Sequence, residues 1–496
     1  MELRLKRDPL NCYTCKLNRH AEDSFTADVV ISDTLPDASS VILSDGDFCL
    51  WRLDLSSGSA EAEGEWKGSI CYAAESDGTP VRFPVSVGVR LRVSDDLITP
   101  ELRPYASFHV CDVAGQLMNS RKLRMRVRIQ MELKLFGAGE EDIVTGIENP
   151  SEDLQMLTEK KTISYISGVE EQVFTAADQI HLSHDNVNDI LCAHSRIRFQ
   201  PARADGRGAI LSGAVLTQML CRGADGSLVS ETAETVFSQL LDFTDCSEGD
   251  ILLSSLQLTS SDVYLNEAGE LQTDFHIVAQ TQCIKTKELA ILTDVYSVSD
   301  ALRLSSAPLA LHRFDREEGF SENAETSMEI PPESSIVYCT LPTLRAFQTQ
   351  EGQAVSALSA VVVLADQDGR ISARQETIPV SLSVSADRSI QAVNVRQPVV
   401  SVAGNLATVR VELDILPSVV HETKCVQIQE IEYLGSDASR EDLPAVTLIR
   451  RADLTDLWET AKRYGSTREA IQTANPELEN GDCAYILIPR ISFSRS

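Results

Sequence analysis

The chain has 496 residues, of which 43% are apolar, so it can bury hydrophobic cores and is too long for one small domain. Its formal net charge of −30 repels nucleic-acid phosphates and anionic lipid headgroups, which argues against both as partners of the whole chain. Glycine and proline occur at ordinary frequencies, which excludes collagen-like and low-complexity sequences.

The N-terminal segment indicates a soluble protein of a reducing compartment. Residues 1–8 contain no apolar stretch of signal-peptide length, and Pro9 would interrupt one. The longest weakly polar stretch, residues 354–365, is too short to span a bilayer. The twelve cysteines are scattered, several at apolar strand positions where a free thiol packs as a small hydrophobe. We therefore expect a cytoplasmic protein without membrane insertion.

Cys12 and Cys15, followed by His20, form the first candidate metal site. One Cys-x-x-Cys pair is only half of a structural zinc site, which needs four ligands. We therefore interpret both cysteines as ordinary thiols of an N-terminal strand, and predict no metal ion and no cofactor.

Three sequence markers recur along the chain and predict an internal repeat with a period of about 145 residues. This period is far above the length of a solenoid repeat, so we expect tandem domains. We place them at residues 1–150, 151–306 and 307–437, the third being the most divergent. The blocks begin near Phe25, Phe174 and Phe320; an Asp-Gly pair follows at Asp77, Asp225 and Asp368; and an Ala-Gly-x-Leu segment follows at Ala114, Ala268 and Ala403.

Each block has the period-two pattern of β-strands. Residues 123–135 alternate between apolar and polar side chains, with Arg124, Arg126 and Arg128 on the polar face. That arginine face either solvates one side of a strand or pairs with an acidic neighbouring repeat. Each Asp-Gly pair tolerates positive φ at both turn centres and so predicts a hairpin. We predict a mainly β chain of tandem antiparallel sandwich or barrel-like repeats, between which alternation does not decide.

Linkers are expected where the periodicity stops. The candidate segments are acidic and contain Gly or Pro. They are residues 137–153, 305–323 and 435–444.

His181, His184, Cys192 and His194 form a second candidate metal site, because they cluster in the sequence of the second block. The first block offers no comparable set, and we interpret the four as ordinary residues. No phosphate-binding glycine loop, His-Glu-x-x-His or Gly-x-Ser-x-Gly motif occurs. We therefore predict that the chain is not an enzyme and has no catalytic residues.

The last fifty residues change character and predict a small β-α-α-β unit at residues 445–492. Asp456 and Glu459, and Ser466 and Glu469, both match the capping box that begins a helix. Strand-like segments flank the two predicted helices. Within the first helix Trp458 has polar neighbours, and we expect it to be the large core anchor of the unit.

This tail resembles a LysM domain through Leu457-Trp-Glu-Thr-Ala-Lys-Arg-Tyr464, Ala474-Asn475 and Ile486-Leu-Ile-Pro489. The family binds glycans that contain N-acetylglucosamine in a groove between two loops. Where the family has Gly-Asp-Ser or Gly-Asp-Thr, this chain has Leu454-Thr455-Asp456, so the loop loses a glycine. The resemblance implies a groove that binds either a protein or a glycan, lined by Asp453, Leu454, Thr455, Asn475, Pro476, Glu477 and Leu478.

The repeats resemble the SPOCS domain of spore coat proteins. The resemblance is carried by residues 1–15, by Asp33-Thr-Leu-Pro-Asp37 and by Phe237-Ser-Gln-Leu-Leu-Asp242. SPOCS-like repeats followed by one LysM domain are the order found in the SipL-type spore coat morphogenetic proteins. These act in the mother cell at the forespore surface, with the repeats as assembly modules and LysM contacting the coat-basement ATPase.

The resemblances imply a non-enzymatic scaffold for spore coat assembly. Its expected partners are the coat-basement ATPase or other spore coat proteins, and sheet edges offer a route to self-association. The alternative is a protein that binds peptidoglycan through its LysM domain.

Overall fold

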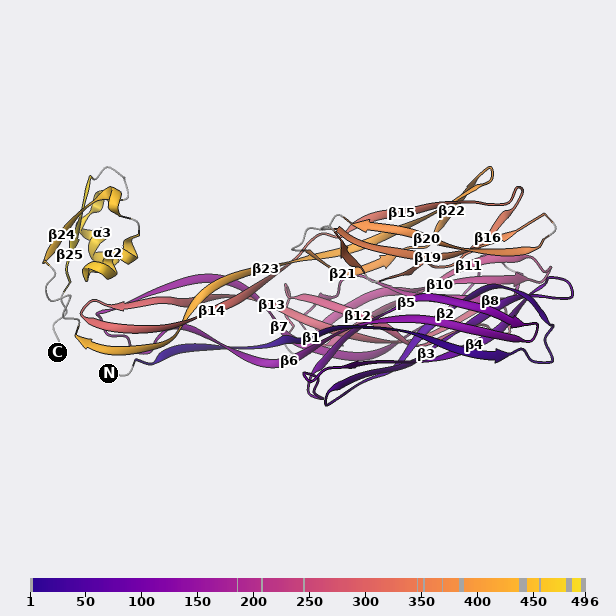
Figure 1. The fold of residues 1–496 in the computed structure, drawn as a ribbon, viewed down its shortest axis with the longest axis horizontal. Helices are drawn as coiled ribbons and strands as arrows, with labels where there is room; N and C mark the ends of the chain where they lie inside the picture. Colours follow the sequence, from indigo (N-terminus) through magenta and orange to yellow (C-terminus); the bar gives the residue numbers. More distant parts are fainter. Residues whose placement is uncertain are drawn as a thin grey trace.

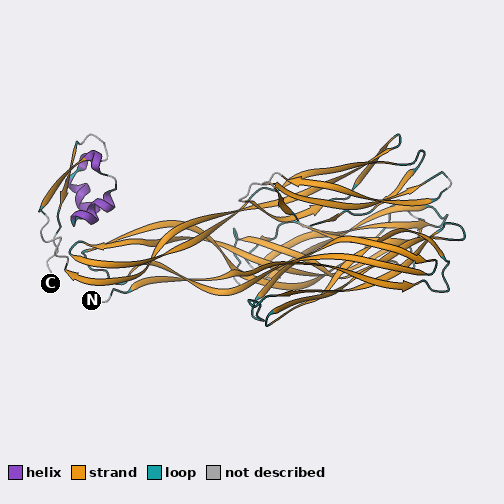
Figure 2. Ribbon diagram, in the orientation of Figure 1, coloured by secondary structure: helices purple, strands orange, loops and turns teal. Residues whose placement is uncertain are grey.

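The computed structural model describes residues 3–491, except 185, 207, 244–245, 346, 351–352, 368, 383–387, 437–443, 455 and 479–483. It is mainly antiparallel β, as the sequence predicts, and its described helices lie near the C-terminus (Figure 2). The molecule is elongated: small sheets gather at one end, long strands lead away from them, and both termini lie near the far end (Figure 1). Within the described ranges, no helix combines the length and apolar character needed to cross a membrane.

Three ribbons of long antiparallel strands run along the molecule (Figure 1). Alternation explains them: on β6 every second side chain from Leu123 to Leu135 is fully buried, while the arginines between them face solvent. The first ribbon is β1 (Leu5–Val30) with β6 (Lys122–Ile147), and the second is β7 (Leu154–Ile180) with β13 (Leu271–Ser297). The third is β23 (Leu406–Ser436) with β14 (Asp300–Arg316) and then β15 (Phe320–Glu329).

A smaller sheet forms between the two strands of each ribbon. The first small sheet contains β2 (Ala38–Ser56), β3 (Ser59–Ala74) and β4 (Pro80–Ser94). The second contains β8 (Val187–Phe199), β9 (Arg203–Ala204), β10 (Gly208–Gly223) and β11 (Leu228–Asp242). The third contains β16 (Ser335–Cys339), β17 (Thr343–Leu344), β18 (Gln348–Gln350), β19 (Gln353–Ala365) and β20 (Ile371–Leu382). The ribbons are extended by β5 (Arg103–Asn119), β12 (Ile251–Leu265), β21 (Arg388–Val395) and β22 (Val399–Ala403).

Each small sheet packs face to face on the nearer half of its ribbon, so the arrangement of the described strands is a sandwich. In the first sandwich the fully buried Trp66 of β3 packs into a cluster with Leu123 and Val127 of β6. In the second, Leu211 packs with Phe275, and in the third Leu358 packs with Val411. Burial of these apolar side chains contributes about 25 cal/mol per Å² removed from water.

The far halves of the three ribbons pack on one another and form a stalk, defined by residues 5–15, 137–147, 154–166, 284–297, 300–316 and 418–436. Its core is shared by all three ribbons. One buried cluster contains Leu10, Ile143, Ile163, Leu289 and Leu311, which belong to five different strands.

Two of the expected linkers are therefore wrong. Most of residues 137–153 lies in β6, and most of residues 305–323 lies in β14 and β15. A stalk strand buries few side chains, so Gly and acidic residues that suggest a linker are compatible with its solvated faces. The third expected linker, 435–444, begins in β23, and residues 437–443 lie outside the described part of the chain.

The expected Asp-Gly hairpins are confirmed, with a different turn geometry. Gly78, Gly226 and Gly369 have φ of +76°, +84° and +75° and lie between paired strands. Asp77 is not in the positive-φ region; its carboxylate instead accepts a hydrogen bond from the Thr79 amide at 3.0 Å. Asp368 lies outside the described residues.

The Ala-Gly-x-Leu marker is not structurally equivalent in the three blocks. Gly269 and Gly404 occupy hairpin turns at φ of +80° and +64°. Gly115 lies inside strand β5, and the first hairpin turn comes later, at residues 120–121. The recurring marker thus corresponds to a turn in the second and third blocks and to a strand in the first.

The three small sheets meet at a junction of buried side chains. An apolar cluster joins Leu43, Cys192 and Val363, one from each sheet. Next to it, Asp45 of β2 lies 2.7 Å from Nδ1 of His194 on β8 and 3.4 Å from the hydroxyl of Tyr338 on β16. A buried charge remains stable only when it is paired in this way, so the contact fixes how the three sheets pack.

The close approach of β2 and β3 beside Trp66 can be tested by substitution. A Cβ atom at Gly68 would clash with the Asp45 carbonyl oxygen and the Trp66 indole, whereas one at Gly88 meets no atom within 4 Å. We expect Gly68→Ala to destabilise the first sandwich by about 2 kcal/mol and Gly88→Ala to have little effect. Urea unfolding followed by tryptophan fluorescence measures both; equal midpoints would contradict the close packing.

The junction predicts a dependence of stability on pH. Burial alone would lower the pKa of His194, but the carboxylates of Asp45 and Asp47 outweigh it and the pKa is raised, although Arg196 opposes them. The charged imidazole therefore stabilises the fold below about pH 6.5, and this contribution is lost as pH rises through the folded-state pKa. We expect His194→Asn to lower the urea midpoint more at about pH 6 than at about pH 9; a loss independent of pH would contradict this prediction.

Candidate functional site: the C-terminal unit at the end of the stalk

The C-terminal unit, residues 446–491, contains the helices of the described chain. Strand β24 (Val446–Arg450) pairs antiparallel with β25 (Tyr485–Pro489). Between them lie the 3-10 turn η1 (Arg451–Asp453), helix α2 (Leu457–Tyr464), helix α3 (Arg468–Ala474) and the 3-10 turn η2 (Pro476–Leu478). Ile471, Ile486 and Ile488 are buried between the helices and the two strands.

Local capping explains where both helices begin and end. Asp456 accepts a hydrogen bond from the Trp458 amide at 3.1 Å, and Gly465, at φ +61°, ends α2. The N-cap of α3 is Thr467, whose hydroxyl accepts from the Ala470 amide, so the expected cap at Ser466 is wrong by one residue. Ser466 instead belongs to the end of α2, because its amide donates to the Ala461 carbonyl.

The unit is attached to the stalk through Trp458. This side chain is 4% exposed, which confirms it as a core residue. The core it joins is shared with the stalk, because it includes Tyr296 near the end of β13 and Val298 just after that strand. The Trp458 and Tyr296 rings meet edge to face with centroids 4.8 Å apart. The Tyr296 hydroxyl donates to the Ser466 carbonyl at 2.9 Å.

Asp294 of β13 completes this attachment. Its carboxylate accepts hydrogen bonds from the Trp458 indole at 2.7 Å and from the Lys462 ammonium at 2.6 and 2.8 Å. Charge-assisted hydrogen bonds of this length, partly shielded from water, are stronger than exposed ion pairs. The structure therefore holds the C-terminal unit at the tip of the stalk.

The seven residues expected to line a groove have different surroundings. Asp453, Pro476 and Glu477 are exposed, whereas Leu454 and Leu478 pack against the core of the unit. Thr455 lies outside the described residues.

Asn475, another of the seven, has a structural role. Its amide group donates to the Ile471 and Leu487 carbonyls at 2.7 and 2.6 Å, and accepts from the Leu487 amide at 2.8 Å. These bonds connect the end of α3 to β25. The side chain polar atoms of Asn475 are thus already engaged within the unit.

A hollow of about 380 Å³ lies where β24 meets α2. Of the predicted groove residues, Asp453 is the one that contributes to its lining. Its other lining residues are Leu448, Ile449, Arg450, Glu459, Thr460, Arg463, Tyr464 and Tyr485. The hollow therefore combines two aromatic rings with charges of both signs.

Next to the hollow, the outer side of the two-stranded sheet forms an apolar face, defined by Val446, Leu448, Tyr485 and Leu487. These side chains are 52%, 60%, 55% and 39% exposed. Leu448 lies directly opposite Leu487 in the register, so their side chains share one face. This face was not predicted from the sequence. Its signal is the successive apolar residues Leu448–Ile449 and Tyr485–Ile488, which place apolar side chains on both sides of a two-stranded sheet.

The side chains of the two sequence-predicted metal clusters do not converge in the structure. Cys12 is buried and Cys15 is exposed on β1. His181, His184 and His194 each contact a different carboxylate: those of Glu270, Glu231 and Asp45. Cys192 and His194 lie two residues apart on β8, whereas His181 and His184 precede that strand.

The arginine face pairs within its own sheet and not with another repeat. Arg124 contacts Asp28 of β1 at 2.6 Å, and Arg126 contacts Asp112 of β5 at 3.4 Å. Both are exposed cross-strand pairs, which contribute little to stability individually.

No protein-family model, curated protein or solved structure matches the chain. The function is therefore argued from the chemistry of these residues.

The attachment of the C-terminal unit can be tested at Asp294. We expect Asp294→Asn to loosen the unit, because the neutral amide no longer pairs with the Lys462 ammonium. Amide hydrogen exchange in α2 and at the end of β13 should accelerate at least about tenfold. Asp274→Asn, on the same strand but 53% exposed, is the control and should leave exchange unchanged. Identical exchange in the two variants would show that Asp294 does not hold the unit.

Proposed function

We propose that the chain is a non-enzymatic scaffold for assembly of a spore coat, acting in the mother cell at the forespore surface. Its three β blocks are copies of one SPOCS-like assembly module, and its C-terminal unit is a LysM-type domain that docks on a coat protein. The recurring order of elements supports the module assignment: each block has a long ribbon, an intervening small sheet and an edge strand. The β-α-α-β order of the C-terminal unit supports the second assignment.

The observation that carries the docking proposal is the apolar face of Val446, Leu448, Tyr485 and Leu487. Apolar side chains grouped on one face of a small sheet favour a protein partner, since apolar and aromatic side chains make up the centre of protein interfaces. The hollow beside this face adds the charges of Arg450 and Asp453, which suit the polar rim of an interface. We expect the coat-basement ATPase to cover this surface.

The attachment to the stalk supports presentation of this surface to a partner. Trp458 and Lys462 fix the unit on Asp294, so partner binding does not require the unit to be ordered first. The apolar face lies on β24 and β25, whereas the contact with the stalk uses α2. One element therefore anchors the unit and another remains for the partner.

The three sandwiches offer further contacts for assembly. In the second, β11 is at the edge of its sheet, and its Val236 and Leu240 are 72% and 41% exposed. An edge strand has unpaired backbone groups that accept a strand from another chain. Several such contacts on one chain raise the effective concentration at a surface, so each of them can be weak.

One observation favours the alternative, binding of peptidoglycan. Tyr464 and Tyr485 line the hollow together with Arg463 and Glu459. Aromatic rings and a few convergent polar groups are the ordinary components of a small-molecule site. In this alternative the hollow would receive an N-acetylglucosamine unit of the glycan strand.

A binding experiment separates the two functions. The full-length chain is tested in parallel against the purified coat-basement ATPase and against purified peptidoglycan. We expect the double variant Leu448→Asp, Leu487→Asp to lose at least about tenfold in affinity for the ATPase, because charges replace the centre of the interface. Val173→Asp changes a strand valine of β7 that is 64% exposed, outside both the C-terminal unit and the proposed assembly edge, and is the control.

The outcomes are distinct. Binding of wild type to peptidoglycan alone would replace the scaffold proposal with the alternative. Binding to the ATPase that survives the double variant would place the interface elsewhere, and the predicted loop residues Asp453 and Glu477 would then be the next positions to change.

A further inference from the structure

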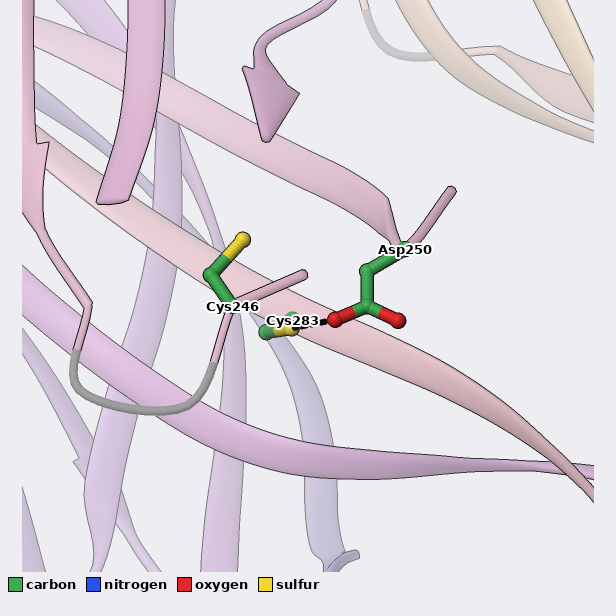
Figure 3. Close-up of side chains that lie close together, drawn as sticks. All are labelled: Cys246, Asp250 and Cys283. Carbon is green, nitrogen blue, oxygen red and sulfur yellow. Dashed lines mark hydrogen bonds between the residues drawn. The ribbon is translucent and has the colours of Figure 1, made fainter. Parts of the chain in front are cut away.

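Cys246, Asp250 and Cys283 converge in the second sandwich, in the part of the chain that the structure describes (Figure 3). Their two thiol sulfurs and one carboxylate oxygen all lie within 4.8 Å of one another. Cys246 and Asp250 come from the loop between β11 and β12, and Cys283 comes from the middle of β13. The sequence gives no signal of the group, because 37 residues separate Cys246 from Cys283.

The loop holds its two side chains in place. Gly249, at φ +98°, allows a tight turn in which the Asp250 amide donates to the Ser247 carbonyl at 3.0 Å. The Ser247 amide donates in return to Oδ2 of Asp250 at 2.8 Å. This oxygen also lies 3.8 Å from the Cys283 sulfur, which donates to it (Figure 3). The carboxylate is therefore oriented toward the thiols by the backbone of its own loop.

Both cysteines are shielded from water: Cys246 is 6% exposed and Cys283 is fully buried. They belong to the apolar core of the second sandwich, next to Phe243. A thiol that serves only as a small hydrophobe has no need of an acidic neighbour. The Asp250 carboxylate accepts the Ser247 amide within its loop and also lies against a pair of buried thiols, so an anionic oxygen and two sulfurs converge on one point.

We propose that Cys246, Asp250 and Cys283 bind one Zn²⁺ ion. Two thiolates and a carboxylate supply three ligands of a tetrahedral site, and a water molecule supplies the fourth. With Zn–S bonds of about 2.3 Å, tetrahedral geometry places two sulfurs about 3.8 Å apart, so the ligand atoms reach the ion with small movements of the loop. Sulfur ligands favour Zn²⁺ over the hard cations Mg²⁺ and Ca²⁺.

The two thiols carry their protons when no ion is bound. Burial raises the pKa of Cys246 to about 12 and also raises that of Cys283, so without an ion both thiols are protonated. Zn²⁺ displaces both protons, and the nearby Lys285 ammonium partly offsets the charge of the two thiolates.

The ion would fasten the β11–β12 loop to β13, the strand that continues into the stalk. Binding to the folded state alone stabilises that state by mass action. With three protein ligands and a water the site is more open than a closed four-ligand zinc site, and its effect is to fasten the loop; it is independent of the docking function proposed for the C-terminal unit.

The test uses the reduced full-length chain, freed of metal and titrated with Zn²⁺ against a chromophoric chelator. We expect one ion per chain. Cys246→Ser and Asp250→Asn should each weaken binding more than about 100-fold, since loss of even an outer-shell partner costs 10- to 100-fold. Cys221→Ser, a substitution of another fully buried cysteine of the second block, is the control and should bind as wild type does.

Co²⁺ provides a second readout, because thiolate ligation gives a sulfur-to-metal charge-transfer absorption that carboxylate ligation alone does not. This band should be present in wild type and Cys221→Ser, and lost in Cys246→Ser. Asp250→Asn keeps the size of a partly exposed side chain and should not disturb folding. A loss of metal binding in this variant therefore reports the lost ligand and not misfolding. Absence of stoichiometric binding to folded wild type, equal binding by Cys246→Ser, or a Cys246–Cys283 disulfide that persists under reducing conditions would overturn the proposal.

Discussion

In each ribbon the paired strands contribute side chains to two cores, one in a sandwich and one in the stalk. One register shift in each of the first two ribbons lies where one core gives way to the other: between Cys15 and Leu17 in the first, and between Cys283 and Ile284 in the second. A further shift in each lies within the stalk, at Lys6/Arg7 and at Leu292/Asp294. A bulge bends a strand and increases its twist without ending the pairing. In the third ribbon the same change is made by an interruption between Arg316 and Phe320. Sandwich and stalk are thus one continuous structure.

The period-two pattern makes the ribbons partly predictable from the sequence. Residues 123–135 bury every second side chain of a sandwich, so their alternation is strict and the strand is evident. Residues 138–142 are exposed, because they lie on the stalk between its buried clusters and the sandwich, and their Gly and acidic residues resemble a linker. Contacts between ribbons also leave no local signal: Asp45 and His194 are 149 residues apart and meet only once the sheets have packed.

In the candidate site, too, local features could be predicted from the sequence and contacts between distant segments could not. The caps of α2 and α3 follow from local spacing and were predicted to within one residue. Asp294 is an isolated acid in a strand, and nothing near it in the sequence relates it to Trp458 or Lys462. The apolar face on β24 and β25 could have been found, because a two-stranded sheet with apolar residues at successive positions must expose some of them.

In the proposed scaffold, the same stalk that fixes the C-terminal unit also separates the two kinds of contact that assembly would use. Tyr296 and Asp294 hold the unit at the tip, while the sandwiches and their edge strands gather at the opposite end of the molecule (Figure 1). A partner bound at the apolar face therefore lies a full stalk length from the edges of the sandwiches. The two kinds of contact do not compete for space, so a chain docked through its C-terminal unit keeps its sandwich edges free for neighbouring chains. In the proposed scaffold, multivalent attachment and lateral assembly would reinforce each other, because every added neighbour would bring a further docking unit to the same surface.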